Sequence, residues 1–204
     1  MPATGPTSNS ISSVGSTFSV TLPAYTMDVL LIPVLGNTPP VLAAISNYTV
    51  NVGQTVTFTA TATNQPPPPL TFSLLSAPTN ATLNAATGAF SWRPLVTQAN
   101  TTNPVSLEVT ASGTPSLSAT QSFSIMVNPL TLPSLTPVSF SNSLFTMQIR
   151  GQTGPDYEIQ TSTNLTQWSA DFTTNSPAMP FSWQDIAATN SARFYRVVVG
   201  PPLP

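Results

Sequence analysis

Strict alternation of apolar and polar residues is the dominant pattern of this chain. Residues 55–63 read TVTFTATAT, which places Val56, Phe58 and Ala60 on one face and threonines on the other. A repeat of two matches the geometry of a β-strand, in which successive side chains point to opposite faces. This segment is therefore predicted to be a half-buried strand.

The same alternation recurs along most of the chain. Turn-forming segments rich in Gly, Pro, Asn and Ser separate the alternating runs, and no helical repeat extends beyond two turns. Short strands divided by such turns are typical of β-sandwiches. The predicted inward-facing sets are Leu70, Phe72 and Leu74; Phe90 and Trp92; Val105, Leu107, Val109 and Ala111; Phe123, Ile125 and Val127; Phe145, Met147 and Ile149; Tyr157 and Ile159; Phe181 and Trp183; and residues 194–199.

Proline-rich segments divide the chain into parts. NPLTLPSLTP at 128–137 carries three prolines in ten residues, which favours a semi-rigid connector over a strand. We therefore predict an N-terminal extension at 1–36, a first sandwich at 37–128, a linker at 129–137 and a small second sandwich at 138–204. The extension contains an apolar strand region without partner strands, so it must join a neighbouring sheet, pair with another chain or remain from a missing domain.

Composition excludes several kinds of chemistry. The 204 residues include no Lys, His or Cys, and only 5% are charged. Imidazole bases, thiolates and Schiff-base lysines are thus absent, which leaves carboxylates, hydroxyls and arginines. The net charge of -2 and the dispersed arginines make nucleic acid and membrane surfaces poor partners, and no apolar run is long enough to span a bilayer. We predict a non-enzymatic protein without cofactor or metal, whose hydroxyl- and amide-rich surface is typical of secreted or cell-surface β-proteins.

Residues 40–128 resemble a known family. The matching stretches are PVLAAISNYTVNVGQTVTFTATATN, LTFSLLSAPTNATLNAATGAFSWRP and VSLEVTASGTPSLSATQSFSIMVN. They resemble the immunoglobulin-like (cadherin-like) domains of secreted bacterial proteins, which implies a seven-stranded sandwich serving as a spacer, adhesive or accessory module. The acidic turn that helps cadherin-like modules hold calcium is replaced here by Asn64, Gln65 and prolines, so no calcium site is expected.

The flanking segments carry further resemblances. FSVTLPAYTMDVLL at 18–31 looks like the closing strands of the sandwich that follows the barrel in several glycoside hydrolase families, and the C-terminal part looks like a module that ends long exported bacterial proteins. The predicted fold is therefore all-β, with an immunoglobulin-like or cadherin-like sandwich, then a fibronectin-like one, preceded by an apolar strand extension.

Carboxylates offer the one catalytic pattern that composition allows. Asp156 and Glu158 lie two positions apart, a spacing that puts both on one face of a strand. Tyr157 and Ile159 make the better core face, so we expect both carboxylates to point into water as ordinary charges. Glu108 and Arg93 both alternate outward in the first sandwich and are expected to form a surface ion pair.

Aromatic residues are the better functional candidates, because the faces of sugar rings stack on exposed aromatic rings. Trp168 lies in the polar segment NLTQWSADF and is the first candidate for a glycan platform, followed by Trp183 and Tyr25. Alternation with Phe181 also explains Trp183 as a core residue, and alternation with Phe90 explains Trp92 as one. Four Asn-x-Ser/Thr sequons occur, at Asn47, Asn80, Asn100 and Asn164.

Two functions from different classes remain open. The first is a non-catalytic accessory or spacer region of a secreted bacterial polysaccharide-acting enzyme or adhesin, with weak binding of a polysaccharide or cell-surface glycan. The alternative is a self-assembling subunit of an extracellular filament or surface layer, in which residues 18–35 complete the sheet of a neighbouring copy. A hydrolase using Asp156 and Glu158 is a third and weaker hypothesis.

Overall fold

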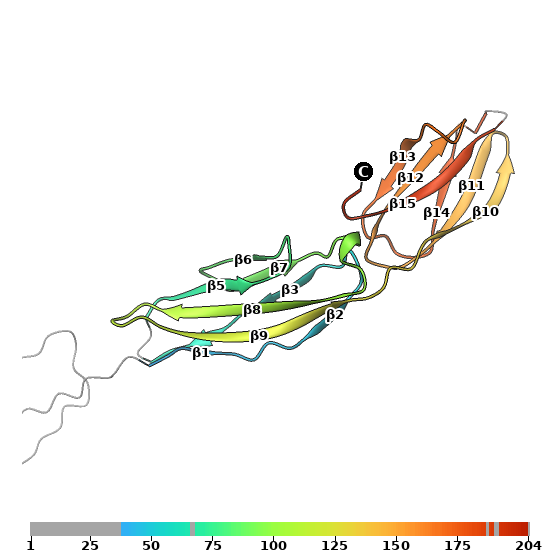
Figure 1. Ribbon diagram of the computed structural model, residues 1–204. Coiled ribbons are helices and arrows are strands. Elements are labelled where there is room, and N and C mark those ends of the chain that lie inside the picture. The colour runs from blue at the N-terminus through green and yellow to red at the C-terminus, as the bar shows by residue number, and fades with distance from the viewer. Residues whose placement is uncertain (1–37, 66–67, 187, 190–191, 204) are drawn as a thin grey trace, which may run out of the picture. The chain divides into compact units, whose positions relative to one another are not determined.

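The computed structural model describes residues 38–203, apart from 66–67, 187 and 190–191, and this part of the chain is built from β-strands (Figure 1). Within the described residues, the first sandwich has a four-stranded sheet in the order β2-β9-β8-β5, a three-stranded sheet in the order β3-β7-β6, and a short β1-β4 ladder. The strands are β1 (Val41–Leu42), β2 (Tyr48–Val50), β3 (Val56–Thr59), β4 (Ala62–Thr63), β5 (Leu70–Ser76), β6 (Thr82–Leu83), β7 (Ala89–Trp92), β8 (Thr101–Ala111) and β9 (Leu117–Val127). A 3-10 turn, Val96–Gln98, precedes β8.

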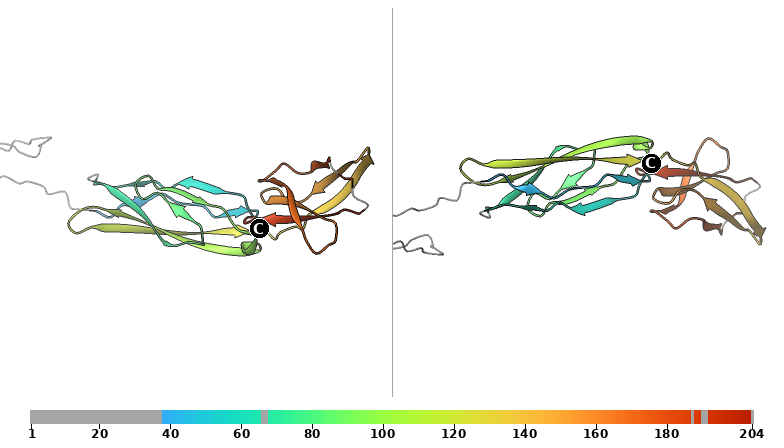
Figure 2. Two further views of the ribbon diagram at one scale, coloured as in Figure 1. Left: turned by 90° about the horizontal axis from the view of Figure 1, so that it is seen from above. Right: turned by 90° about the horizontal axis from the view of Figure 1, so that it is seen from below.

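A long antiparallel hairpin of β8 and β9 forms the centre of the four-stranded sheet. The two strands pair from Thr101 opposite Val127 to Ala111 opposite Leu117, and they run side by side in Figure 1 and in both views of Figure 2. Strand β2 joins the other edge of β9 in parallel. Because this register fixes which side chains face inward, alternate positions of both long strands enter the core.

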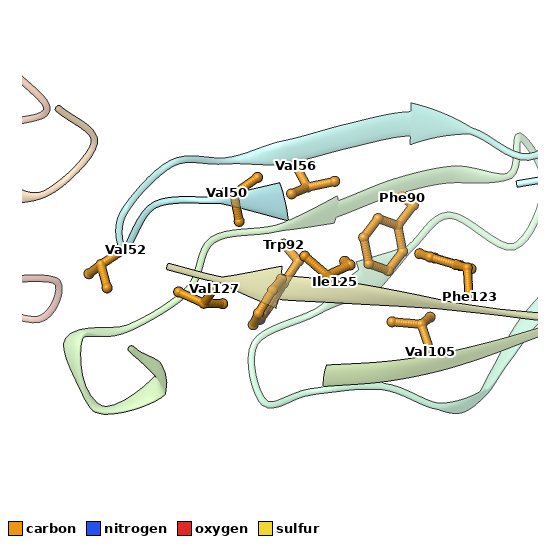
Figure 3. Packing of buried hydrophobic residues seen from close by; sticks show 9 residues of the cluster. All are labelled: Val50, Val52, Val56, Phe90, Trp92, Val105, Phe123, Ile125 and Val127. Carbon is orange, nitrogen blue, oxygen red and sulfur yellow. The ribbon is translucent and has the colours of Figure 1, made fainter. Parts of the chain in front are cut away.

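Aromatic and branched residues from both sheets fill the core of the first sandwich (Figure 3). Phe90 and Trp92 on β7 pack against Val105 on β8 and Phe123 on β9. Trp92 is 1% exposed, and its indole Nε1 donates a hydrogen bond to the carbonyl oxygen of Thr79 at 2.9 Å. A buried indole needs such a partner, so Trp92 contributes both apolar burial and a satisfied polar group.

Two three-stranded sheets form the second sandwich, in the orders β10-β11-β14 and β13-β12-β15. Its core contains Met147 and Ile149 from β11 and Ile159 from β12, with Phe181 and Trp183 packed against them. The two sheets therefore bury one shared apolar layer. The strands are β10 (Ser134–Ser141), β11 (Leu144–Arg150), β12 (Asp156–Ser162), β13 (Ser169–Thr174), β14 (Phe181–Asp185) and β15 (Phe194–Gly200).

The predicted fold class, two β-sandwiches read from period-two alternation, is confirmed. Two details differ. Strand β10 begins at Ser134, inside the predicted linker at 129–137, because Pro137 lies on an edge strand, where a missing N–H need not break a ladder. Strand β13 was not predicted, since its apolar residues do not alternate cleanly. The expected N-terminal extension, including residues 18–35 and Tyr25, lies outside the described residues.

Polar contacts connect the two sandwiches, which belong to one compact unit, Gly36–Pro204. Arg93, directly after β7, donates to both carboxylate oxygens of Asp156 at the start of β12, at 2.6 and 3.0 Å, and its Nε donates to the carbonyl of Gly53 at 2.7 Å. The backbone N–H of Ser176 donates to the same carboxylate at 3.1 Å. We name this group the Arg93–Asp156 junction.

Glycines bring the two backbones together beside the junction. A Cβ atom at Gly53 would lie 2.4 Å from the carbonyl oxygen of Gly154, and one at Gly154 would lie 2.7 Å from the carbonyl oxygen of Val52. Both glycines also have positive φ, at 72° and 114°. Steric room and backbone conformation therefore both require glycine at these two positions.

The part of the chain that the structure describes contains no helix with the length and apolar character needed to cross a membrane.

Candidate functional site

A polar cavity of about 390 Å³ lies at the end of the second sandwich where β12 turns into β13. Trp168 and Ser169 line it at the start of β13, together with Asp171, and Arg193 lines it from the segment before β15. The remaining lining residues carry hydroxyl and amide groups: Thr161, Ser162, Thr163, Asn164 and Gln167. We call this space the Trp168 cavity.

Side-chain hydrogen bonds hold the turn that carries Trp168. The Ser162 hydroxyl accepts the backbone N–H of Leu165 at 2.9 Å, and the Asn164 Oδ1 accepts the backbone N–H of Gln167 at 3.0 Å. The indole Nε1 of Trp168 then donates to the carbonyl of Leu165 at 3.1 Å. Short polar side chains often organise turns in this way, so the turn sequence itself positions the indole before any ligand arrives.

A chain of contacts along the outer face of β12 supports the Trp168 ring. The Arg196 guanidinium carbon lies 4.3 Å from the ring centroid, in a cation–π contact. Arg196 Nε donates to Gln160 Oε1 at 2.7 Å, and Gln160 Nε2 donates to Glu158 Oε1 at 2.5 Å. Glu158 is only 6% exposed. A buried carboxylate therefore anchors, through Gln160, the arginine that packs on Trp168.

Two carboxylates hold Arg193, which lines the Trp168 cavity. Arg193 Nε lies 2.6 Å from Asp185 Oδ2, and its Nη2 lies 3.6 Å from Asp171 Oδ2. The Tyr195 hydroxyl donates to Asp185 at 2.9 Å. Burial, reinforced by the hydrogen bond and the negative charge of Asp185, raises the pKa of Tyr195 to about 12.

The Trp168 cavity suits recognition of a polar molecule that also has an apolar face. It offers hydroxyl and amide groups around a half-buried indole, and the side chain of Asp171 is 38% exposed and can accept hydrogen bonds. Its volume lies within the range of about 300–1,000 Å³ that small-molecule sites occupy. No group of three His, Cys, Asp or Glu side chains placed to hold a metal ion occurs among residues 38–203 outside the gaps named above.

The aromatic residues singled out from the sequence lie in three different settings. Trp168 lines the cavity, whereas Trp183 packs against the core of the second sandwich, with its ring 6.0 Å from that of Tyr195. Tyr25 lies outside the described residues. The structure therefore supports Trp168 as the aromatic candidate at this site and accounts for Trp183 by packing.

The expectation that Asp156 and Glu158 point into water is wrong. Tyr157 and Ile159 do face the core, but the two carboxylates on the opposite face are also buried, at 5% and 6% exposure. The Arg93–Asp156 junction covers one, and Gln160 covers the other. The two carboxylates therefore bind different residues, and neither lines the Trp168 cavity.

The expected surface ion pair between Arg93 and Glu108 is also wrong, because Arg93 pairs with Asp156 of the second sandwich instead. Outward alternation was correct for Arg93, but alternation does not reveal that another sheet meets that face.

Sequence reasoning missed Asp171 and Arg193 as cavity residues and Arg196 as the residue that packs on Trp168. Arg196 meets Trp168 because β13, β12 and β15 are neighbours in one sheet, with Gln160 between Ala170 and Arg196 in the register. No local spacing signals this neighbourhood. The polar run NLTQWSADF was the available signal, and it pointed to Trp168 alone.

Comparison with known protein families gives a match for the first sandwich. Residues 39–128 match the family model described as "Putative Ig domain". A comparison with curated proteins gave no match.

Three solved structures illustrate the structural likeness. A nucleoside hydrolase-related hypothetical protein from Saccharophagus degradans, described as associated with carbohydrate metabolism, is 18% identical over 45% of this chain and 26% of its own, with a TM-score of 0.40. The protocadherin GammaB4 extracellular domain is 18% identical over 52% of this chain and 19% of its own, with a TM-score of 0.38. Sidekick-1 immunoglobulin domains 1–5 are 14% identical over 66% of this chain and 30% of their own, with a TM-score of 0.41.

The chain thus spans less than a third of the length of each of these three structures. The family match covers all strands of the four-stranded sheet and the three-stranded sheet of the first sandwich. Residues 39–128 of this chain therefore form a β-sandwich whose sequence matches the "Putative Ig domain" model.

Proposed function

We propose that this chain is a non-catalytic accessory region of a secreted protein and that it binds a saccharide weakly through the Trp168 cavity. The observation that carries the proposal is the cavity itself, in which a preorganised indole lies among hydroxyl and amide groups. The C–H face of a pyranose ring can pack on an indole while the ring hydroxyls exchange hydrogen bonds with polar neighbours. Polysaccharide or cell-surface glycan is accordingly the proposed partner.

Of the nine residues that line the Trp168 cavity, two are charged, Asp171 and Arg193, and their charges balance, which supports weak, stacking-based binding. Such binding draws little energy from long-range attraction, so it should change little with salt. A spacer role fits the Arg93–Asp156 junction, because a polar, hydrogen-bonded connection can hold two modules together without a metal ion. The alternative, self-assembly through residues 18–35, stays a prediction because that segment lies outside the described residues.

Trp168→Ala tests the proposal. The intact chain is mixed with insoluble cellulose, xylan, mannan and chitin, and bound protein is measured by depletion from solution at low and high salt. Removing an aromatic residue at the centre of a binding site commonly costs more than about 1 kcal/mol, so the affinity of the variant should fall by about tenfold. Phe140→Ala is the matched control, because it removes an exposed aromatic side chain from β10 in the opposite sheet.

Two results would contradict the proposal. The first is that the unmodified chain binds no polysaccharide or soluble oligosaccharide at millimolar concentration. The second is that Trp168→Ala binds as well as the unmodified chain while Phe140→Ala loses binding.

A further inference from the structure

Two arginines, Arg193 in the cavity lining and Arg196 over the Trp168 ring, are already engaged by protein groups. Arg193 is held between Asp185, which is 2% exposed, and Asp171. Its Nε lies 2.6 Å from the first carboxylate, and the guanidinium side chain is itself only 20% exposed. An incoming anion would therefore have to compete with two carboxylates that the fold keeps in place.

Arg196 is engaged in a different way. One face of its guanidinium group lies over the Trp168 ring, and its Nε donates to Gln160, which in turn donates to the buried Glu158. Because Gln160 and Glu158 are both more than nine-tenths buried, this arrangement is held by packing as well as by hydrogen bonds. The arginine thus serves to orient the indole.

The charged groups at and beside the cavity leave no positive excess. Arg193 and Asp171 line the cavity, and Asp185 holds Arg193, so these three groups have a net charge of -1. Arg196 and Glu158, in the contact chain beside Trp168, add one charge of each sign and leave that value unchanged. A carboxylate or sulfate on a ligand would lose its water and meet this excess of negative charge. A neutral sugar meets no such penalty, since its hydroxyls can donate to Asp171 and accept from the amide of Asn164 or Gln167.

We infer that the Trp168 cavity selects neutral saccharides and rejects uronic-acid and sulfated ones. This inference rests on the proposed saccharide-binding function and adds the ligand class. Asp171 is the specificity-determining residue, because its exposed carboxylate both accepts sugar hydroxyls and occupies Arg193. Selectivity here comes from a repulsive element as well as from attractive contacts.

Paired oligosaccharides of equal length test the inference. Cello-, xylo-, manno- and chito-oligosaccharides are compared with oligogalacturonate, oligomannuronate and sulfated galactan oligomers, by calorimetry and by Trp fluorescence at low salt. We expect at least one neutral series to bind about tenfold more tightly than every acidic series.

Asp171→Ala should reduce this difference in affinity. It should weaken binding of the neutral oligosaccharides and strengthen binding of the acidic ones, because it releases Arg193 Nη2 and removes one negative charge. Glu108→Ala is the matched control, since it removes the same charge from β8 of the first sandwich. Equal or tighter binding of an acidic series by the unmodified chain would overturn the inference while leaving the proposed function in place. The inference would also be overturned if Asp171→Ala and Glu108→Ala changed the preference for neutral oligosaccharides equally. The net charge of the protein, rather than the cavity, would then explain the preference. Absence of binding to every saccharide would remove the proposed function and the inference together.

Discussion

Breaking the Arg93–Asp156 junction is the most direct test of how the two sandwiches depend on each other. Arg93→Met keeps most of the apolar stem but removes the guanidinium group. Asp156 then retains the backbone N–H of Ser176 but loses both hydrogen bonds from Arg93. Because Arg93 and Asp156 belong to different sandwiches, the lost energy should appear in whichever sandwich unfolds first.

The exposure of the two side chains sets the magnitude. The side chain of Asp156 is 7% exposed and that of Arg93 is 35% exposed, so the pair lies between two measured limits. Exposed ion pairs contribute about 0.2–1 kcal/mol, and removing one partner from a fully buried pair costs about 3–5 kcal/mol. We expect Arg93→Met to lower the free energy of unfolding by about 2 kcal/mol, which corresponds to a fall of about 1 M in the urea midpoint.

A double-mutant cycle with Asp156→Asn isolates the interaction. Unfolding in urea is followed by Trp fluorescence, which reports on Trp92 in the first sandwich and on Trp168 and Trp183 in the second. Each transition is fitted separately, since a two-domain chain need not unfold in one step. Arg150→Met, at an exposed arginine of β11, is the control and should leave both transitions unchanged.

Additive effects would refute this reasoning. If the double variant loses the sum of the two single losses to within about 0.5 kcal/mol, the two side chains do not interact in solution. A loss in Arg150→Met equal to that in Arg93→Met would also refute it, because a general charge effect would then explain both.

Two further predictions concern Gly154 beside the junction and the half-buried Tyr195. Gly154→Ala should lower the free energy of unfolding by about 2 kcal/mol, since the new Cβ meets the carbonyl of Val52 at a positive φ, and urea unfolding that matches the unmodified chain would contradict this. The pKa of Tyr195 is raised to about 12 in the folded chain, above the ordinary value of about 10. The protonated tyrosine therefore contributes fully to the free energy of unfolding below pH 10, and this contribution declines as the pH rises toward 12. Asp185→Asn should lower the pKa of Tyr195 by removing a carboxylate acceptor and its charge, as measured by the ultraviolet absorbance of tyrosinate, and a titration curve unaltered by Tyr195→Phe would show that Tyr195 is not the group observed.

The alternation of side chains by itself determined the class of fold and most of the core. Val105, Leu107 and Val109 are each 1% exposed or less, and Trp92 is equally buried, as period-two spacing predicts. These positions are predictable because a strand of fixed geometry must turn every second side chain toward its own sheet's covered face. Composition likewise determined which chemistries are absent, since a chain without His, Lys or Cys cannot use them.

Tertiary structure alone decided what lies against each outward-facing side chain. Asp156 and Glu158 alternate away from the core, yet both are buried, because Arg93 covers the first and Gln160 covers the second. Trp168 meets Arg196 only because three strands pair in one particular order. Spacing along a strand reveals which face a residue occupies, whereas the packing of distant segments determines what that face meets, and for this protein that packing created both the junction and the cavity.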